Sequence, residues 1–253
     1  TTMDMTQTYE EPSSGGGCGR RSLSATDQAC RDCAVHSRAF CAVLDDKALL
    51  QLEALHSFRD LSGEDSLFME GDDATYFYTI LSGAFRLSKL LPDGRRQIIG
   101  FALPGEFMGL SVEDNYICNA EALTGSRLCR FSVTDLKRIG RKNPEMDRQL
   151  LTMTNATLSQ AQDHMLLLGR MNAKEKIASF LCSLMKRAAA ADQPKDPIAL
   201  PMSRADIADY LGLTIETVSR TFTRLKTDKI ISLPDHAQVK VDDMAALVSL
   251  AEG

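Results

Sequence analysis

The sequence lacks the features that mark a membrane protein, a secreted protein or an enzyme. It contains no run of about 18 unbroken apolar residues, the length that a membrane span requires. Residues 1–29 are rich in Ser, Thr and Gly and have neither the basic start nor the apolar stretch of a secretory signal. The four His are scattered, and no nucleophile, base and orienting group are recognisable together. We therefore expect a flexible N-terminal tail, a cytoplasmic protein with no membrane partner, and no enzyme activity.

The chain also lacks the excess positive charge of a protein that coats nucleic acid indiscriminately. It carries 29 Lys and Arg against 34 Asp and Glu, a net charge of −5 at pH 7. Any binding to DNA must therefore come from a local basic surface.

Seven cysteines are present, and in a reducing compartment we do not expect them to form a disulfide framework. Cys30 and Cys33 form a CxxC pair, and Cys41 follows after seven further residues. Thiolates at such spacing can converge on one soft metal centre, and the bound metal would help to order a segment with almost no core of its own. Three thiolates leave one ligand missing. His36, within the segment, is interpreted as a solvated loop residue.

Residues 61–131 show short apolar or alternating runs separated by turn signals. The runs 76–81, 85–90 and 97–101 at this spacing indicate an antiparallel barrel or sandwich of hairpins, which we interpret as a sensory domain.

A long helix is predicted from Asn143-Pro144 to about residue 168, because Pro suits the first helical turn. One stripe of this helix has the three-and-four spacing of a two-stranded coiled coil, which favours a homodimer over a helix packed only on its own domain. The stripe consists of Leu151, Thr154, Leu158, Ala161, Met165 and Leu168. A second stripe with Leu150, Met153 and Leu167 could face the barrel.

The remainder of the chain has a winged helix-turn-helix layout. After a hinge at 169–172, the sequence predicts a helix over 173–191, a Pro-punctuated link, a helix pair over 203–229 and a short two-stranded end around 230–241. The predicted organisation is thus a tail (1–29), a cysteine segment with the barrel (30–142), a dimerisation helix (143–169) and a DNA-binding domain (170–253).

The helix pair carries strong local signals. Ser203 and Asp206 have the capping-box spacing, Gly212 permits the tight turn, Thr214 caps the second helix, and Val218 is the predicted buried anchor. Side chains near the start of the second helix would enter the major groove, where Arg can bond a guanine edge and Glu can accept a hydrogen bond from cytosine. Ser can donate to or accept from a base. Basic residues farther along the helix are suited to phosphates. The predicted DNA-binding residues are Glu216, Ser219, Arg220, Arg224 and Lys226. The alternative is that Glu216 and Arg220 merely pair on a solvated helix.

Residues 211–220, LGLTIETVSR, resemble the recognition helix of the CRP/FNR regulator family, and the resemblance covers nearly everything from Cys30 to the C-terminus. It implies an α+β fold with a cyclic-nucleotide-binding-like β-barrel (jelly roll), a long dimerisation helix and a C-terminal winged helix-turn-helix. It also implies that the protein binds palindromic double-stranded DNA with TTGAT-type half-sites. A contact with RNA polymerase is implied as well, and the family resemblance places it near the turn 92–95.

The segment 126–131, SRLCRF, resembles the barrel position where FNR proteins carry their remaining cluster cysteine. The resemblance therefore implies an oxygen-labile 4Fe-4S cluster held by Cys30, Cys33, Cys41 and Cys129, whose cluster-bearing form dimerises and controls genes for low-oxygen metabolism. The seven-residue spacing between Cys33 and Cys41 resembles the FnrN/FixK-like branch.

Other ligands remain open alternatives. Zinc could bind the same four thiolates, and a cluster-free regulator could respond to thiol oxidation, another ligand or its own abundance. Residues 104–109 resemble the phosphate cassette of cyclic-nucleotide regulators, but Cys118-Asn119-Ala120 stands where those proteins have an Arg-Ser pair. We therefore expect no cAMP binding and interpret Gly105 and Gly109 as structural turns. Cys18, Cys118 and Cys182 are assigned no function.

Overall fold

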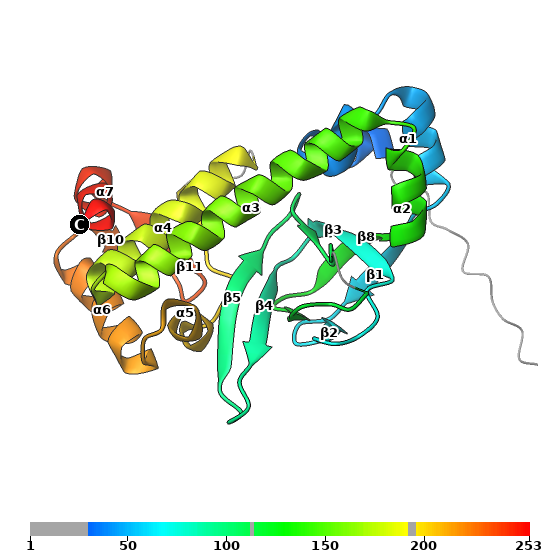
Figure 1. Cartoon of the computed structure of the whole chain (residues 1–253). Coiled ribbons are helices and arrows are strands. Elements are labelled where there is room, and N and C mark those ends of the chain that lie inside the picture. Colours follow the sequence, from blue (N-terminus) through cyan, green and yellow to red (C-terminus); the bar gives the residue numbers. More distant parts are fainter. Residues whose placement is uncertain (1–29, 112–113, 192–195) are drawn as a thin grey trace, which may run out of the picture.

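The computed structural model describes residues 30–111, 114–191 and 196–253 (Figure 1). The predicted tail over residues 1–29 lies outside these ranges. The described chain starts with three short 3-10 helices, η1 (Cys30–Asp32), η2 (His36–Arg38) and η3 (Phe40–Val43), followed by helix α1 (Asp46–Glu53). No helix among the described residues is long and apolar enough to cross a membrane.

Two antiparallel four-stranded sheets form the barrel, with strand orders β1-β8-β3-β6 and β2-β7-β4-β5. The strands are β1 (Ser57–Leu61), β2 (Ser66–Phe68), β3 (Tyr76–Ser82), β4 (Phe85–Leu90), β5 (Arg96–Ala102), β6 (Phe107–Met108), β7 (Asn119–Ala122) and β8 (Ser126–Ser132). Ile80, Phe85 and Leu128 are completely buried between the sheets. The predicted jelly-roll barrel is confirmed, and its three predicted runs are strands β3, β4 and β5.

Strand β3 is buried on both of its faces. Tyr78 and Ile80 point into the barrel, whereas Phe77 packs with Phe40 of the cysteine segment on the outer face of the sheet. Successive side chains of a strand point to opposite faces, so one apolar run supplies two cores. The expectation that the cysteine segment has almost no core was wrong, because Phe40 is completely buried there.

Helix α2 (Val133–Gly140) leads from the barrel into α3 (Pro144–Arg170). Pro144 lies in the first turn of α3, as predicted. In Figure 1 this long helix crosses from the cysteine segment to the C-terminal domain. Leu150 and Met153 pack on the core of the cysteine segment, and Leu167 packs on the core of the C-terminal domain.

The C-terminal domain has the predicted helix-turn-helix, α5 (Arg204–Leu211) and α6 (Ile215–Thr227), packed on α4 (Ala173–Ala190). The expected two-stranded end is wrong in one respect. Strands β10 (Ile231–Ser232) and β11 (Gln238–Val241) are joined by β9 (Ile198–Ala199) from the Pro-punctuated link, because β9 pairs with β11. A further helix, α7 (Met244–Glu252), ends the chain.

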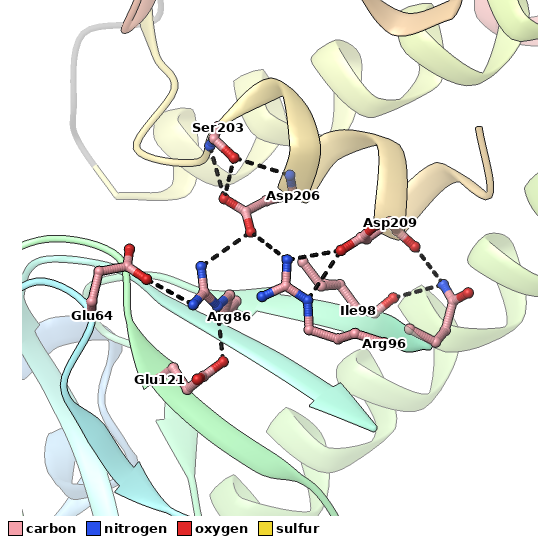
Figure 2. A network of polar contacts seen from close by, with 9 residues as sticks. Glu64, Arg86, Arg96, Ile98, Glu121, Ser203, Asp206 and Asp209 are labelled. Atoms are coloured by element: carbon pink, nitrogen blue, oxygen red, sulfur yellow. Dashed lines mark hydrogen bonds and ion pairs between the residues drawn. The ribbon is translucent and has the colours of Figure 1, made fainter. Parts of the chain in front are cut away.

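The barrel and the C-terminal domain are packed directly together. Ile98 and Phe101 of β5 belong to the same apolar core as Phe180 and Ile207. Above this core, Asp206 Oδ1 accepts hydrogen bonds from Arg86 and Arg96, each at 3.2 Å (Figure 2). This interface fixes α5 against the β4–β5 side of the barrel.

Candidate metal centre and nucleic-acid interface

Four cysteines line one cavity of about 350 Å³ between the cysteine segment and the outer face of the barrel. Cys30 lies in η1, Cys33 directly follows it, and Cys41 lies in η3. Cys129 comes from β8, almost ninety residues later in the chain. The structure thus brings together all four residues that were predicted as metal ligands.

Aromatic packing positions the cysteine segment over the sheet. The Phe40 ring meets Phe77 edge-on at 5.1 Å and Phe131 edge-on at 5.3 Å between ring centroids. Edge-to-face pairs of this kind add about 0.5–1.5 kcal/mol beyond the burial of area. Because Phe40 precedes Cys41 and Phe131 lies two residues after Cys129, this packing holds the two thiols at the same cavity.

Burial raises the pKa of three of these thiols, those of Cys30, Cys41 and Cys129. Burial, Glu53 and Cys33 raise the pKa of Cys30 from 9.0 to about 11. Burial and the neighbouring Cys30 and Cys33 raise the pKa of Cys41 to about 12. The pKa of Cys129 is raised by burial first and then by the other three cysteines. A metal that binds these three thiols must therefore displace their protons.

Among the described residues, no three His, Cys, Asp or Glu side chains form a group arranged to hold a metal ion. The prediction that His36 is a solvated loop residue was wrong, because His36 begins η2 and is half-buried, with its Nδ1 3.8 Å from the Cys41 sulfur. Cys118 is buried in the barrel and Cys182 is half-buried in the C-terminal domain, whereas Cys18 lies outside the described residues.

The predicted dimer seam lies mostly on the surface of this single chain. Leu151, Leu158 and Met165 are 61%, 54% and 63% exposed, and Thr154 and Ala161 are also exposed. Leu168 is the exception, because it is half-buried on the core of the C-terminal domain. Exposed apolar side chains that repeat every seven residues favour pairing with a second helix.

The predicted local structure of the helix-turn-helix is confirmed. Ser203 and Asp206 form a capping box, and the Thr214 side chain accepts from the backbone of Thr217. Gly212 has the left-handed φ of +62°, and Val218 is completely buried. These contacts fix which face of α6 points to solvent.

The predicted DNA-binding residues, Glu216, Ser219, Arg220, Arg224 and Lys226, are all exposed on α6. Glu216, Ser219 and Arg220 share one face of the helix by their spacing. Hydrogen bonds to its own backbone and to Thr214, together with the charge of Arg220, lower the pKa of Glu216. Arg224 pairs with Asp228 at 3.1 Å, an interaction that DNA phosphate would have to replace.

The barrel interior contains an aromatic stack beside Gly109, one of the two glycines predicted as structural turns. The rings of Phe68 and Tyr116 stack at 3.9 Å between centroids. Gly105 and Gly109 have φ of +90° and +83°, which confirms them as turn residues. A side chain at Gly109 would lie 2.7 Å from the Tyr76 carbonyl oxygen, so the glycine is needed for this close approach.

The packed β-barrel, the long helix and the exposed recognition helix together define a DNA-binding transcription regulator. Residues 58–143 match the family model of a cyclic nucleotide-binding domain, and residues 175–250 match that of a Crp-like helix-turn-helix domain. The chain belongs to the CRP/FNR family of transcription regulators, and its relatives are of the FNR type rather than enzymes.

The nitrogen fixation regulation protein FixK of Bradyrhizobium diazoefficiens is 44% identical, over 88% of this chain and 93% of that protein. The transcriptional activator protein FnrL of Cereibacter sphaeroides is 36% identical, over 88% of this chain and 91% of that protein. The structure of FixK2 from Bradyrhizobium japonicum matches with a TM-score of 0.73 and 36% identity, over 78% of this chain and 97% of that chain.

Proposed function

We propose that this protein is an oxygen-responsive regulator of the FNR type, in which Cys30, Cys33, Cys41 and Cys129 hold a 4Fe-4S cluster. The observation that carries the proposal is the convergence of these four thiols on one cavity. Three come from a segment of twelve residues, and the fourth comes from a distant strand to which that segment is docked.

The chemistry of the donors fits an iron–sulfur cluster. Clusters of this type are held by cysteine thiolates, one on each of four irons, so the sulfurs stand farther apart than around one tetrahedral zinc ion. The cavity walls beside the thiols include Phe40, Leu81 and Phe131, and an apolar shell of this kind limits access of solvent. When bound, the cluster would supply a centre that oxygen degrades.

Binding or loss of the cluster would change the equilibrium between monomer and dimer. The cysteine segment packs on Leu150 and Met153, which directly precede Leu151 and Thr154 of the exposed seam of α3. Ordering this segment would favour pairing of the seam, and a dimer can span two half-sites whereas a monomer cannot. Loss of the cluster would shift the population toward the weaker-binding form.

The proposed DNA target is a palindrome with TTGAT-type half-sites. Glu216, Ser219 and Arg220 would contact base edges, and Arg224 and Lys226 would contact phosphates. As a cytoplasmic activator of genes for low-oxygen metabolism, the dimer would also contact RNA polymerase. The candidate surface is the turn at Asp93 and Arg95, where the two side chains pair at 2.8 Å on the exposed tip of the β4–β5 hairpin.

The decisive experiment is iron and sulfide analysis of anaerobically purified protein, with visible spectra before and after exposure to air. We expect about four irons and four sulfides per chain, a broad visible absorption that air bleaches, and loss of both in Cys129→Ser. Cys182→Ser is the matched control, because this half-buried cysteine lies outside the cavity.

Two other outcomes would replace the proposed iron–sulfur cluster with a different explanation. Zinc in place of iron would make the centre structural and redox-silent. A colourless, metal-free dimer that still binds TTGAT-type DNA would contradict the cluster and assign the signal to a thiol, another ligand or abundance.

A further inference from the structure

A hydroxyl group at the wall of the cysteine cavity has no hydrogen-bond partner within the described part of the chain. Thr79 is only 3% exposed, and its Oγ1 is fully buried without an acceptor or donor. Leaving a buried hydroxyl unpaired is costly, so a group of this kind points to a binding partner that completes it.

The position of Thr79 indicates what that partner is. In the sheet, Thr79 on β3 pairs directly with Cys129 on β8, so their side chains lie next to each other on the same face. Both residues line the cavity. The neighbours of Thr79 along this face of β3 are Phe77 and Leu81, which offer no hydrogen bond.

We propose that the Thr79 hydroxyl donates a hydrogen bond to a sulfur of the bound cluster or to the Cys129 thiolate, and thereby tunes the redox stability of the centre. The inference rests on the proposed cluster. Hydrogen bonds to the sulfurs of an iron–sulfur centre help to set its reduction potential, because they stabilise the more negative, reduced state. Thr79 would therefore make the centre harder to oxidise.

Removing the Thr79 hydroxyl should stabilise the metal-free protein but make the cluster of the cluster-bearing protein easier to oxidise. Thr79→Val keeps the shape of the side chain and removes the unpaired hydroxyl, so the metal-free protein should unfold at a higher temperature. In the cluster-bearing protein the same change should lower the reduction potential and make bleaching in air about two- to tenfold faster. A role in packing alone would move neither cluster property.

The test compares wild type with Thr79→Val, Thr79→Ser and Ser82→Ala. Each is prepared anaerobically and assayed for iron content, midpoint potential, rate of bleaching in air and, after removal of iron, thermal unfolding. Thr79→Ser retains the hydroxyl and should therefore have the same midpoint potential as the wild type. Ser82→Ala is the matched control, because Ser82 lies on the same strand at the cavity but is exposed, and it should change nothing.

An unchanged potential and bleaching rate in Thr79→Val, with a full complement of iron, would overturn the role of Thr79 while leaving the cluster proposal intact. Absence of iron from the wild type would overturn both, and the iron analysis separates the two cases.

Discussion

The barrel packs against the rest of the chain through two faces that satisfy their polar groups differently. The cysteine face lines the cavity that residues 30–43 cover. It consists of Phe77, Thr79, Leu81, Cys129 and Phe131. The helix-turn-helix face, formed by Arg86 and residues 96–101, packs against the C-terminal domain (Figure 2). On the first face, buried thiols with raised pKa and an unpaired hydroxyl surround a cavity.

On the helix-turn-helix face, the charges are paired within the chain. Burial alone would lower the pKa of Arg86, but hydrogen bonds to Glu121 and Glu64 and the charge of Asp206 raise it instead. Arg96 pairs with Asp209 at 2.7 Å. We therefore expect the helix-turn-helix face to be equally stable with or without a bound metal, whereas the stability of the cysteine face should depend on what the thiols bind.

The largest expected effect comes from α3, whose ends pack on these two regions. Leu158→Asp places a charge at the exposed middle of the seam and should convert the dimer to monomer. Specific binding to a palindrome should fall by about 10³-fold or more, because only one half-site can be held. Sedimentation and DNA titration under anaerobic conditions measure both effects.

Gln160→Asp is the matched control for this change, because it adds the same charge to an exposed position on another side of α3. A Leu158→Asp protein that remains dimeric would show that the seam lies elsewhere.

The next largest effect is expected when the buried ion pairs of the helix-turn-helix face are disrupted. Arg86→Met leaves buried Asp206 and the nearby Glu121 with one cation fewer, and should destabilise the protein by about 3–5 kcal/mol in urea unfolding. Arg95→Met removes an arginine from an exposed pair and should cost under about 1 kcal/mol. Equal losses in the two variants would contradict the view that the buried network fixes this face.

The cysteine face should respond to pH in the metal-free protein. Since the folded pKa of Cys30 and Cys41 exceeds the usual 9.0, the folded state holds protons that the unfolded state releases above that pH. The stabilisation is fully present below about pH 9 and is lost as the pH rises toward 11 and 12.

Urea unfolding across this pH range, comparing wild type with Cys41→Ser, isolates the contribution of the Cys41 thiol. The difference between the two proteins should shrink or reverse with rising pH, and a constant difference would contradict the prediction. Metal binding has the opposite dependence, because protons compete with it at low pH.

The smallest expected effect is at His36. Its Nδ1 lies 3.8 Å from the Cys41 sulfur, and we expect it to be a neighbour of the site and not a ligand. His36→Ala should therefore retain full iron, with the bleaching rate changed by no more than about twofold, as for one modest polar contact. Loss of iron in this variant would make His36 a ligand.

The features that the sequence predicted are those with local signals. The capping box at Ser203, the left-handed Gly212 and the proline at the start of α3 each depend on a few neighbouring residues. The strands of the barrel were visible as short apolar runs between turns. The CxxC pair with Cys41 identified three of the four cavity thiols by spacing, and Cys129 followed only from family resemblance.

The missed features depend on pairing between distant residues. Strand β9 lies in a proline-rich link and exists because it pairs with β11. The docking of Phe40 on Phe77 gives the cysteine segment the core that its composition does not reveal. Thr79 stands beside Cys129 only through the register of two strands. Asp206 was recognised as a helix cap, but its ion pairs with Arg86 and Arg96 require the domain interface.

The most direct test of the central claim is to follow cluster absorption and binding to a TTGAT palindrome in one anaerobic sample as air is admitted. We expect specific binding to fall in step with the visible absorption, and the proposed dimer to dissociate with it. Unchanged specific binding after the absorption and iron are lost would contradict it.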